Sequence, residues 1–166
     1  QFRDKHLVVI TGGTGLAPVR SMLHMLAETP GYVRSVHLIS GFKNVDGIVF
    51  HHELEEWKEK FSTIYALDND TKEGWRTGLV TTFVPEIPFD TFDGEYAVVV
   101  VGPPPMMKFT GLALMDQGVE PEKVYMSFER KMSCAIGKCG HCRIDEVYVC
   151  LDGPVFPYTV ARDLID

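Results

Sequence analysis

The sequence predicts an α/β fold, a doubly wound five-stranded parallel sheet followed by a small cysteine-rich lobe. Apolar runs typical of buried strands alternate with helical patterns, turns rich in glycine or proline follow two of these runs, and every cysteine lies after residue 133. Parallel strands need crossover connections, which place helices on both faces of a sheet. We therefore expect residues 1–128 to form an α/β domain and residues 129–166 to form the lobe.

The predicted strands are short and apolar, as expected for strands that are covered on both faces. They span residues 7–10, 35–40, 63–67, 96–101 and 124–128. Between them, apolar residues at helical spacing predict helices at 18–28, 50–61, 79–84 and 106–117. After the cysteines begin, residues 143–149 alternate as a strand does, whereas residues 157–166 show no clear pattern.

Composition excludes several classes of protein. The chain has 166 residues, of which 45% are hydrophobic and 23% charged, so it can bury a core. Its formal net charge of −7 argues against binding to nucleic acid phosphates. No apolar run reaches the roughly 18 residues that span a bilayer, and the first residues lack the apolar core of a signal peptide. We expect a cytoplasmic protein that inserts into no membrane.

The turn after the first predicted strand has the composition of an anion-binding loop. It consists of glycines and a threonine and leads into a helix with an early proline, and its candidate ligand-binding residues are Gly12, Gly13, Thr14, Gly15 and Pro18. Glycines let the backbone approach a ligand closely, and the next helix offers free N–H groups to a pyrophosphate. The turn departs from the G-x-G-x-x-G fingerprint, because Pro18 replaces the third glycine. A turn that only connects two elements is the alternative interpretation.

A second turn follows the fourth predicted strand and contains Gly102, Pro103, Pro104 and Met106. Ligands of open parallel sheets bind at the carboxyl ends of the strands, so two turns there suit an elongated ligand. Because proline has no N–H to donate, we expect this turn to shape a wall of the site. A stiff connection into the next helix is the alternative.

Charged residues after two other strands bear on which dinucleotide binds. Asp68 and Asp70 follow the third strand, where carboxylates accept hydrogen bonds from ribose hydroxyls and repel a 2′-phosphate. They favour NAD(H) over NADP(H). Lys43, after the second strand, has the opposite charge and favours a phosphate. An ordinary surface turn and a surface lysine are the alternatives.

The cysteine pattern is the most specific signal in the chain. Cys134, Cys139, Cys142 and Cys150 are spaced C-x4-C-x2-C-x7-C. The first three match the plant-type spacing of a 2Fe-2S cluster, although the fourth follows sooner than in those ferredoxins. Ala135, Gly137 and Gly140 are small enough to leave backbone N–H groups pointing at sulfur. A structural zinc site with the same four thiolates is the alternative.

Together these motifs resemble the ferredoxin–NADP reductase superfamily, in which a flavin-binding barrel precedes a nicotinamide-binding domain. Residues 11–18 are similar to its pyrophosphate loop and residues 102–106 to its second nucleotide motif. Many members carry a cysteine just before that motif, where Val101 stands here. Residues 127–129 resemble the end of the fifth strand, which implies that Glu129 is a catalytic residue near the flavin and the nicotinamide.

The cysteine-rich segment is similar to one branch of that superfamily. Residues 129–142, 148–150 and 152–156 resemble the reductase component of anaerobic sulfite reductase, the gamma subunits of cytosolic hydrogenases and the electron-transfer subunit of dihydroorotate dehydrogenase. The short interval before Cys150 and the Asp-Gly-Pro-Val-Phe ending favour the first two. The resemblance spans residues 8–156 and implies a 2Fe-2S cofactor and a catalytic partner subunit.

One departure from the family is large, because its FAD-binding barrel would precede Leu7 and only residues 1–6 do. The resemblance therefore implies that the chain is the carboxyl portion of a longer protein and that FAD binds through a missing N-terminal domain. NADH gives up two electrons as hydride, whereas a 2Fe-2S cluster takes one at a time, so a flavin must split the pair. We expect the isolated chain to bind the nucleotide without turnover.

Two functions remain open at this stage. The first is an electron-transfer module that binds NAD(P)H and relays electrons through FAD and the cluster to a partner such as sulfite reductase or hydrogenase. The second is a non-redox nucleotide-binding module with a structural zinc site. Iron and sulfide would indicate the first, and zinc alone would indicate the second.

Overall fold

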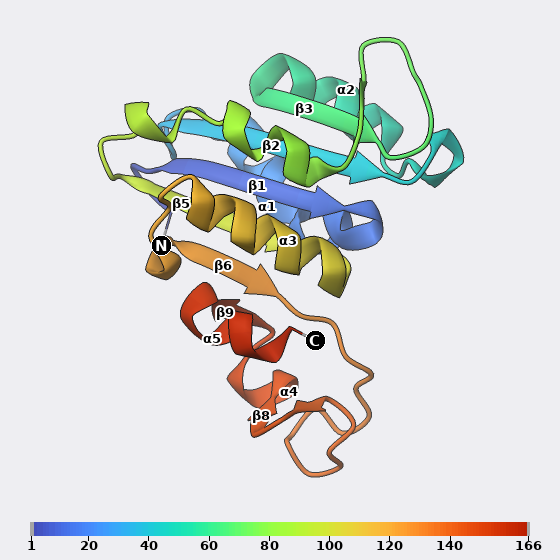
Figure 1. Ribbon diagram of the computed structural model, residues 1–166, viewed down its shortest axis with the longest axis vertical. Helices are drawn as coiled ribbons and strands as arrows, with labels where there is room; N and C mark the ends of the chain where they lie inside the picture. Colours follow the sequence, from blue (N-terminus) through green and yellow to red (C-terminus); the bar gives the residue numbers. More distant parts are fainter. Residues whose placement is uncertain (1, 166) are drawn as a thin grey trace.

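The computed structural model describes residues 2–165, which build an α/β fold around a seven-stranded sheet. The order of the strands is β4-β3-β2-β1-β5-β6-β9, and every pairing is parallel except that of β9 with β6. Figure 1 shows β1 in the middle of this sheet and the cysteine-rich segment below it. Among the described residues, no helix is long and apolar enough to cross a membrane.

The five predicted strands are confirmed. They are β1 (His6–Gly12), β2 (Ser35–Phe42), β3 (Ser62–Leu67), β5 (Tyr96–Val101) and β6 (Val124–Ser127). The chain winds outward from β1 to β3, returns to β5 beside β1, and continues to β6. This reversal of direction next to β1 leaves a crevice at the carboxyl ends of β1 and β5, where such sheets bind ligands.

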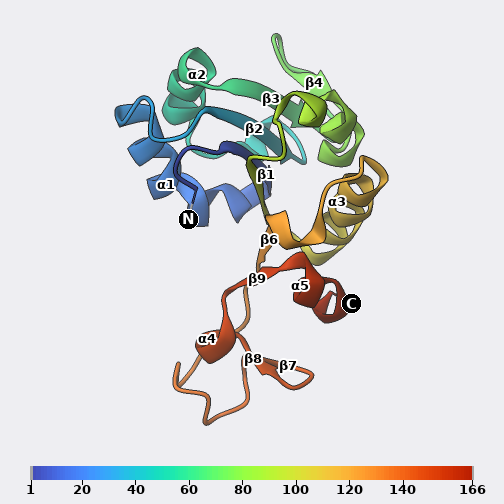
Figure 2. The ribbon, with the colours of Figure 1, turned by 90° about the vertical axis from the view of Figure 1, so that its left-hand side faces the viewer.

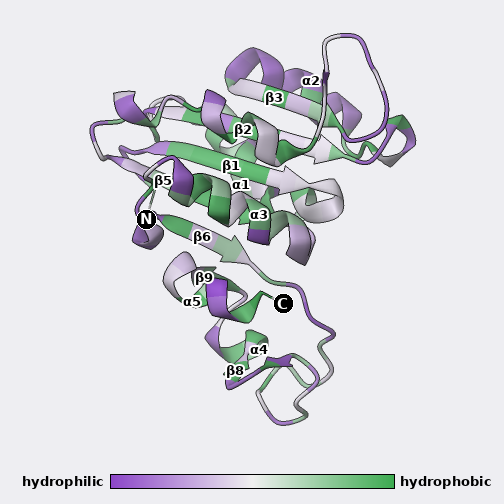
Figure 3. Ribbon diagram, viewed as in Figure 1, coloured by the Kyte–Doolittle hydropathy of each residue, from purple (hydrophilic) through white to green (hydrophobic). Residues whose placement is uncertain are grey.

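Alternating side chains of each strand enter two hydrophobic cores. Leu7 and Val9 point to the face covered by α1 (Leu16–Glu28) and α2 (His51–Lys60), where they pack with Trp57 and other buried residues. Val8 and Ile10 point to the opposite face. Figure 3 shows β1 as hydrophobic and α2 as mostly hydrophilic, as expected for a helix with one face in solvent.

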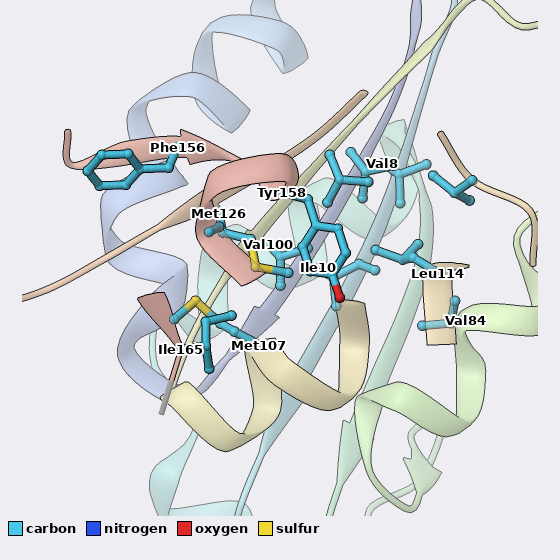
Figure 4. Packing of buried hydrophobic residues seen from close by; sticks show 14 of the residues in the cluster. Val8, Ile10, Val84, Val100, Met107, Leu114, Met126, Phe156, Tyr158 and Ile165 are labelled. Atoms are coloured by element: carbon cyan, nitrogen blue, oxygen red, sulfur yellow. The ribbon is translucent and has the colours of Figure 1, made fainter. Parts of the chain in front are cut away.

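The opposite face is covered by α3 (Pro104–Asp116), the 3-10 helix η3 (Val80–Glu86) and α5 (Tyr158–Leu164). Sequence periodicity predicted a helix over 79–84, and the structure shows 3-10 geometry there, with Pro85 near its end. Proline lacks the N–H that an α-helix needs, which accounts for the short, irregular element. In Figure 4, Tyr158 and Ile165 lie among side chains of the sheet and of α3.

Two strands were not predicted from the sequence. β4 (Arg76–Thr77) pairs with β3, and β9 (Val155–Pro157) pairs antiparallel with β6. Both are too short for an alternating pattern to show. Because β9 and α5 follow the cysteines, the end of the predicted lobe belongs to the α/β core: Ala161 is fully buried there.

The rest of the cysteine-rich segment projects from the edge of the sheet, as Figure 2 shows. It contains the two-stranded ribbon β7 (Arg143–Ile144) and β8 (Val147–Tyr148), which replaces the single strand expected at 143–149, and the short helix α4 (Val149–Asp152). Asp145, in a left-handed conformation, forms the turn of this ribbon. The lobe therefore begins after β6 and ends where β9 rejoins the sheet.

A pair of histidines at the amino-terminal edge of the sheet predicts how stability depends on pH. His37 of β2 packs against the ring of Phe92, on which His6 of β1 is stacked. Burial, and then the charge of His6, lower the pKa of His37 below its usual 6.5. The folded protein therefore binds fewer protons than the unfolded chain as the pH falls below 6.5.

We expect the free energy of unfolding to fall as the pH drops through 6.5 towards the lower pKa of folded His37. His37→Gln removes the titrating group, so its stability should depend less on pH over this range. Urea unfolding of both proteins at pH 7.5 and 5.5 measures the difference. Parallel pH dependences would contradict the assignment.

Candidate functional site: a nucleotide crevice beside a cysteine loop

The two predicted turns meet at the carboxyl edge of the sheet. The first runs from β1 through a 3-10 turn (Gly13–Gly15) into α1, and the second runs from β5 into α3. They touch at Gly15, where an added Cβ would overlap the carbonyl oxygen of Val101. Only glycine permits this approach, and Gly13 has a positive φ of 56° that glycine adopts readily.

Two cavities adjoin at this contact, and both are lined by Gly12 and Pro103. One has a volume of about 360 Å³ and the other about 800 Å³. Each is smaller than an extended dinucleotide needs, but together they form a continuous crevice on either side of the glycine turn. The arrangement suits a ligand with a pyrophosphate at its centre and a ring system at each end.

The smaller cavity collects residues from three loops and one helix. Its predicted members are Gly12, Thr14, Gly15, Gly102, Pro103, Pro104 and Glu129. Sequence reasoning missed Arg130 and Leu164, which also line it. Arg130 adjoins a residue that was singled out, whereas Leu164 lies in a stretch without any pattern. Glu129 follows β6, so the strand order beside β5 places it next to the second turn.

The larger cavity lies between the ends of β2 and β3 on one side and α3 on the other. Of the predicted residues it is lined by Gly12, Gly13, Lys43, Asp68, Pro103 and Met106. Leu79, Phe109 and Leu112 add exposed apolar surface that the sequence did not reveal as part of a site. An apolar cavity with a carboxylate and an ammonium at one end can hold a purine ring and select among ribose substituents.

The two predicted aspartates have different surroundings. Asp68 lines the larger cavity, and burial raises its pKa. Asp70 lines neither of the two cavities, and its carboxylate accepts hydrogen bonds from the backbone N–H groups of Val45 (3.1 Å) and Thr71 (2.8 Å). These bonds lower its pKa. Asp70 therefore braces the loop after β2, which leaves Asp68 as the acidic group facing the crevice.

Pro18 stands in the first turn of α1, as predicted. It lines a further cavity of about 660 Å³ with Ser127, Glu129 and Met132. This cavity opens between the start of α1 and the segment that leads from β6 to the first cysteine. Glu129 thus lies between the nucleotide crevice and the cysteine loop.

The four cysteines come together in one loop and the helix after it. Cys142 is buried, Cys134 and Cys150 are partly buried, and Cys139 is exposed. The loop turns through left-handed conformations at Ala135 (φ 56°), Gly137 (69°) and Gly140 (77°). Such turns orient successive N–H groups to one side, which is the geometry expected around bound sulfur.

Backbone N–H groups donate to two of the thiols. Gly137 donates to Cys150 at 3.3 Å, and Lys138 and Cys139 donate to Cys134 at 3.4 Å. Gly137 was expected in this role, but Lys138 and Cys139 were not. An added Cβ at Gly137 would overlap the side chain of Leu151, so the loop also requires glycine here for packing.

The thiols influence one another's ionisation. The backbone N–H of His141, followed by the hydrogen bonds from Cys134, lowers the pKa of Cys139 to about 7. The neighbouring Cys142 raises the pKa of Cys150. The thiols thus interact as two close pairs, Cys134 with Cys139 and Cys142 with Cys150. A 2Fe-2S cluster needs two thiolates on each iron, so the donor set and its N–H donors fit this group.

Comparison with protein families covers both parts of this site. Residues 9–111 match the oxidoreductase NAD-binding domain family. Residues 129–160 match the iron–sulfur cluster binding domain of dihydroorotate dehydrogenase B. The first match contains both nucleotide turns, and the second contains all four cysteines.

Curated relatives match the chain across both parts. Sulfhydrogenase 2 subunit gamma of Pyrococcus furiosus is 35% identical over 95% of this chain and 60% of its own length. The electron transfer subunit of dihydroorotate dehydrogenase B (NAD(+)) from Lysinibacillus sphaericus is 34% identical over 90% of this chain and 55% of its own length. The chain thus spans a little over half the length of these relatives.

Solved structures show the same fold. An NADH-dependent reduced ferredoxin-NADP oxidoreductase, described for flavin-based electron bifurcation, superposes with a TM-score of 0.72 at 22% identity, covering 100% of this chain and 56% of that one. The cytochrome b5 reductase domain of Ulva prolifera nitrate reductase gives 0.64 at 23% identity over 75% of this chain and 50% of that one. The chain belongs to the oxidoreductase NAD-binding domain family and carries an iron–sulfur binding domain of the dihydroorotate dehydrogenase B type.

Proposed function

We propose that this chain is the NAD(H)-binding and iron–sulfur part of a multi-subunit oxidoreductase, and that it carries electrons between a nicotinamide dinucleotide and a catalytic partner subunit. The observation that supports this most is the position of Glu129. It lines the nucleotide crevice and precedes the first cysteine of the loop, Cys134, by a short connection. The two redox sites are therefore adjacent along the chain and in space.

The protein's own groups bind and orient the nucleotide. Backbone N–H groups at the start of α1 hold the pyrophosphate, and Asp68 accepts hydrogen bonds from the adenosine ribose. Glu129 lies at the opposite end, beside the nicotinamide. Lys43 and Asp68 have opposite charges in one cavity, and the partial burial of Asp68 makes its carboxylate the closer neighbour of the ribose.

The cluster and the flavin supply the redox chemistry. A bound 2Fe-2S cluster accepts and releases single electrons, and FAD, which we propose is held by a part of the protein outside residues 1–166, converts hydride into single electrons. Cys134, Cys139, Cys142 and Cys150 hold the cluster, and the N–H groups of Gly137, Lys138 and Cys139 stabilise charge on sulfur.

The partner that we propose is a catalytic subunit of the hydrogenase or sulfite reductase kind. The names of the relatives support a place within a larger complex, and the family match over residues 129–160 favours iron–sulfur over a structural zinc site. In such a complex the partner sets the substrate, because this chain supplies only the nucleotide and cluster sites.

Metal analysis and a visible spectrum of anaerobically purified chain test the proposal. We expect about two irons and two acid-labile sulfides per chain. The colour should bleach with dithionite and not with NADH alone, because hydride does not pass directly to the cluster. A colourless protein with one zinc would contradict the electron-transfer function and leave a nucleotide-binding module.

Preference for NADH over NADPH tests the role of Asp68. We expect calorimetry to show tighter binding of NADH, because a 2′-phosphate would meet this carboxylate. Asp68→Asn should reduce the preference about 10-fold, since it removes the repulsion and retains hydrogen bonding.

Asp116→Asn is the matched control, because Asp116 lines the same cavity from α3. This variant should keep the preference of the unmodified chain. Equal affinity of the unmodified chain for the two nucleotides would overturn the assignment and point to Lys43 as the group that selects the nucleotide.

Loss of one thiolate tests the separation between the cluster loop and the sheet. Cys139→Ser should abolish the visible absorption of the cluster and make the loop around residues 133–150 accessible to protease. The nucleotide-binding core should still melt cooperatively, because its strands contain no cysteine and β9 and α5 remain packed on it. Circular dichroism and limited proteolysis measure the two effects, and global unfolding would show that the core depends on the cluster.

A further inference from the structure

The helix α5 contributes a wall to the smaller cavity. Leu164, which is 5% exposed, lines that cavity opposite groups from the turns after β1, β5 and β6. The remaining lining residues come from these turns and from the first residues of α3. Leu164 thus reaches the nucleotide crevice from the segment that follows the cluster cysteines.

The position of α5 is fixed from two sides. β9 pairs with β6 through Ser127 and Val155, and the N–H of Phe128 donates to the carbonyl of Pro154 at 2.9 Å. At the start of α5, the ring of Tyr158 fills the space over Gly111 of α3, where an added Cβ would stand 2.5 Å from the ring. A helix held this closely against α3 presents a defined surface to the crevice.

The cavity that Leu164 lines is the one suited to the nicotinamide ring. The larger cavity contains Asp68 and Lys43, which fit a ribose and its substituents, and the glycine turn between the cavities fits the pyrophosphate. The smaller cavity then takes the remaining ring, beside Glu129. Leu164 and Met107 give this cavity apolar surface, which favours a flat, weakly polar ring.

We propose that Leu164 is a positioning residue for the nicotinamide ring and that α5 is a working part of the nucleotide site. The inference rests on the proposed function, because it assumes that a dinucleotide spans both cavities. Leu164 packs against the ring and limits its movement away from Glu129. The same segment supplies Cys150 before it turns back to the sheet, so one stretch of chain serves both redox sites.

Comparing two ligands separates a role at the ring from a general effect on folding. NADH and ADP-ribose share the adenosine and pyrophosphate, and only NADH carries the nicotinamide. We expect calorimetry on the full 166-residue chain to show tighter binding of NADH. Leu164→Ala should weaken NADH binding about 10-fold and leave ADP-ribose affinity within about twofold, as expected when apolar surface is removed from a ligand pocket.

Ile165→Ala is the matched control, because Ile165 is similar in size, 8% exposed, and does not line the cavity. It should lower the melting temperature as Leu164→Ala does and leave the ratio of the two affinities unchanged. Should Leu164→Ala fold poorly, Leu164→Phe keeps an apolar side chain and narrows the cavity. This variant should also weaken NADH binding and spare ADP-ribose.

Three results would overturn the proposal. These are equal affinities of the unmodified chain for NADH and ADP-ribose, an equal loss of both affinities in Leu164→Ala, and the same change of ratio in Ile165→Ala. Failure of the unmodified chain to bind either ligand would instead contradict the proposed function, on which the inference depends. The outcomes for Leu164 and for the nucleotide site are therefore distinguishable.

Discussion

The close contact between the turns after β1 and β5 is the constraint on which the rest of the site depends. Gly15 lies against the carbonyl of Val101, and no side chain fits between them. This contact brings two loops from neighbouring strands together and divides the crevice into two cavities around a shared glycine turn. It also directs the free N–H groups of α1 towards the middle of the crevice, where a pyrophosphate would lie.

The edge of the sheet beyond β5 connects the nucleotide site to the cysteine loop. β6 ends at Ser127, and the following residues line the crevice before the chain enters the loop. After Cys150 the chain returns as β9 along the same strand. β6 therefore has the start and the end of the iron–sulfur segment at its carboxyl end, which keeps the two redox sites near each other without a separate domain interface.

Sequence patterns predicted the parts of the structure that depend on local interactions. The five main strands, the glycine turn, the proline turn and the cysteine spacing were recognisable because each has a composition that its geometry requires. β4, β9 and α5 were not, since short edge strands and a seven-residue helix bury too few residues for a periodic pattern. Asp70 was assigned to the ligand, whereas its carboxylate binds backbone N–H groups of the neighbouring loop.

By itself the sequence determined the chemistry of the protein: a glycine turn for a pyrophosphate, four thiolates for a cluster, and strands buried on both faces. The tertiary structure decided which residues share a cavity. Leu164, Arg130 and Leu79 join the crevice through packing between elements that are distant in sequence. Such contacts leave no local pattern, because they depend on the order of strands in the sheet and on where the chain returns to it.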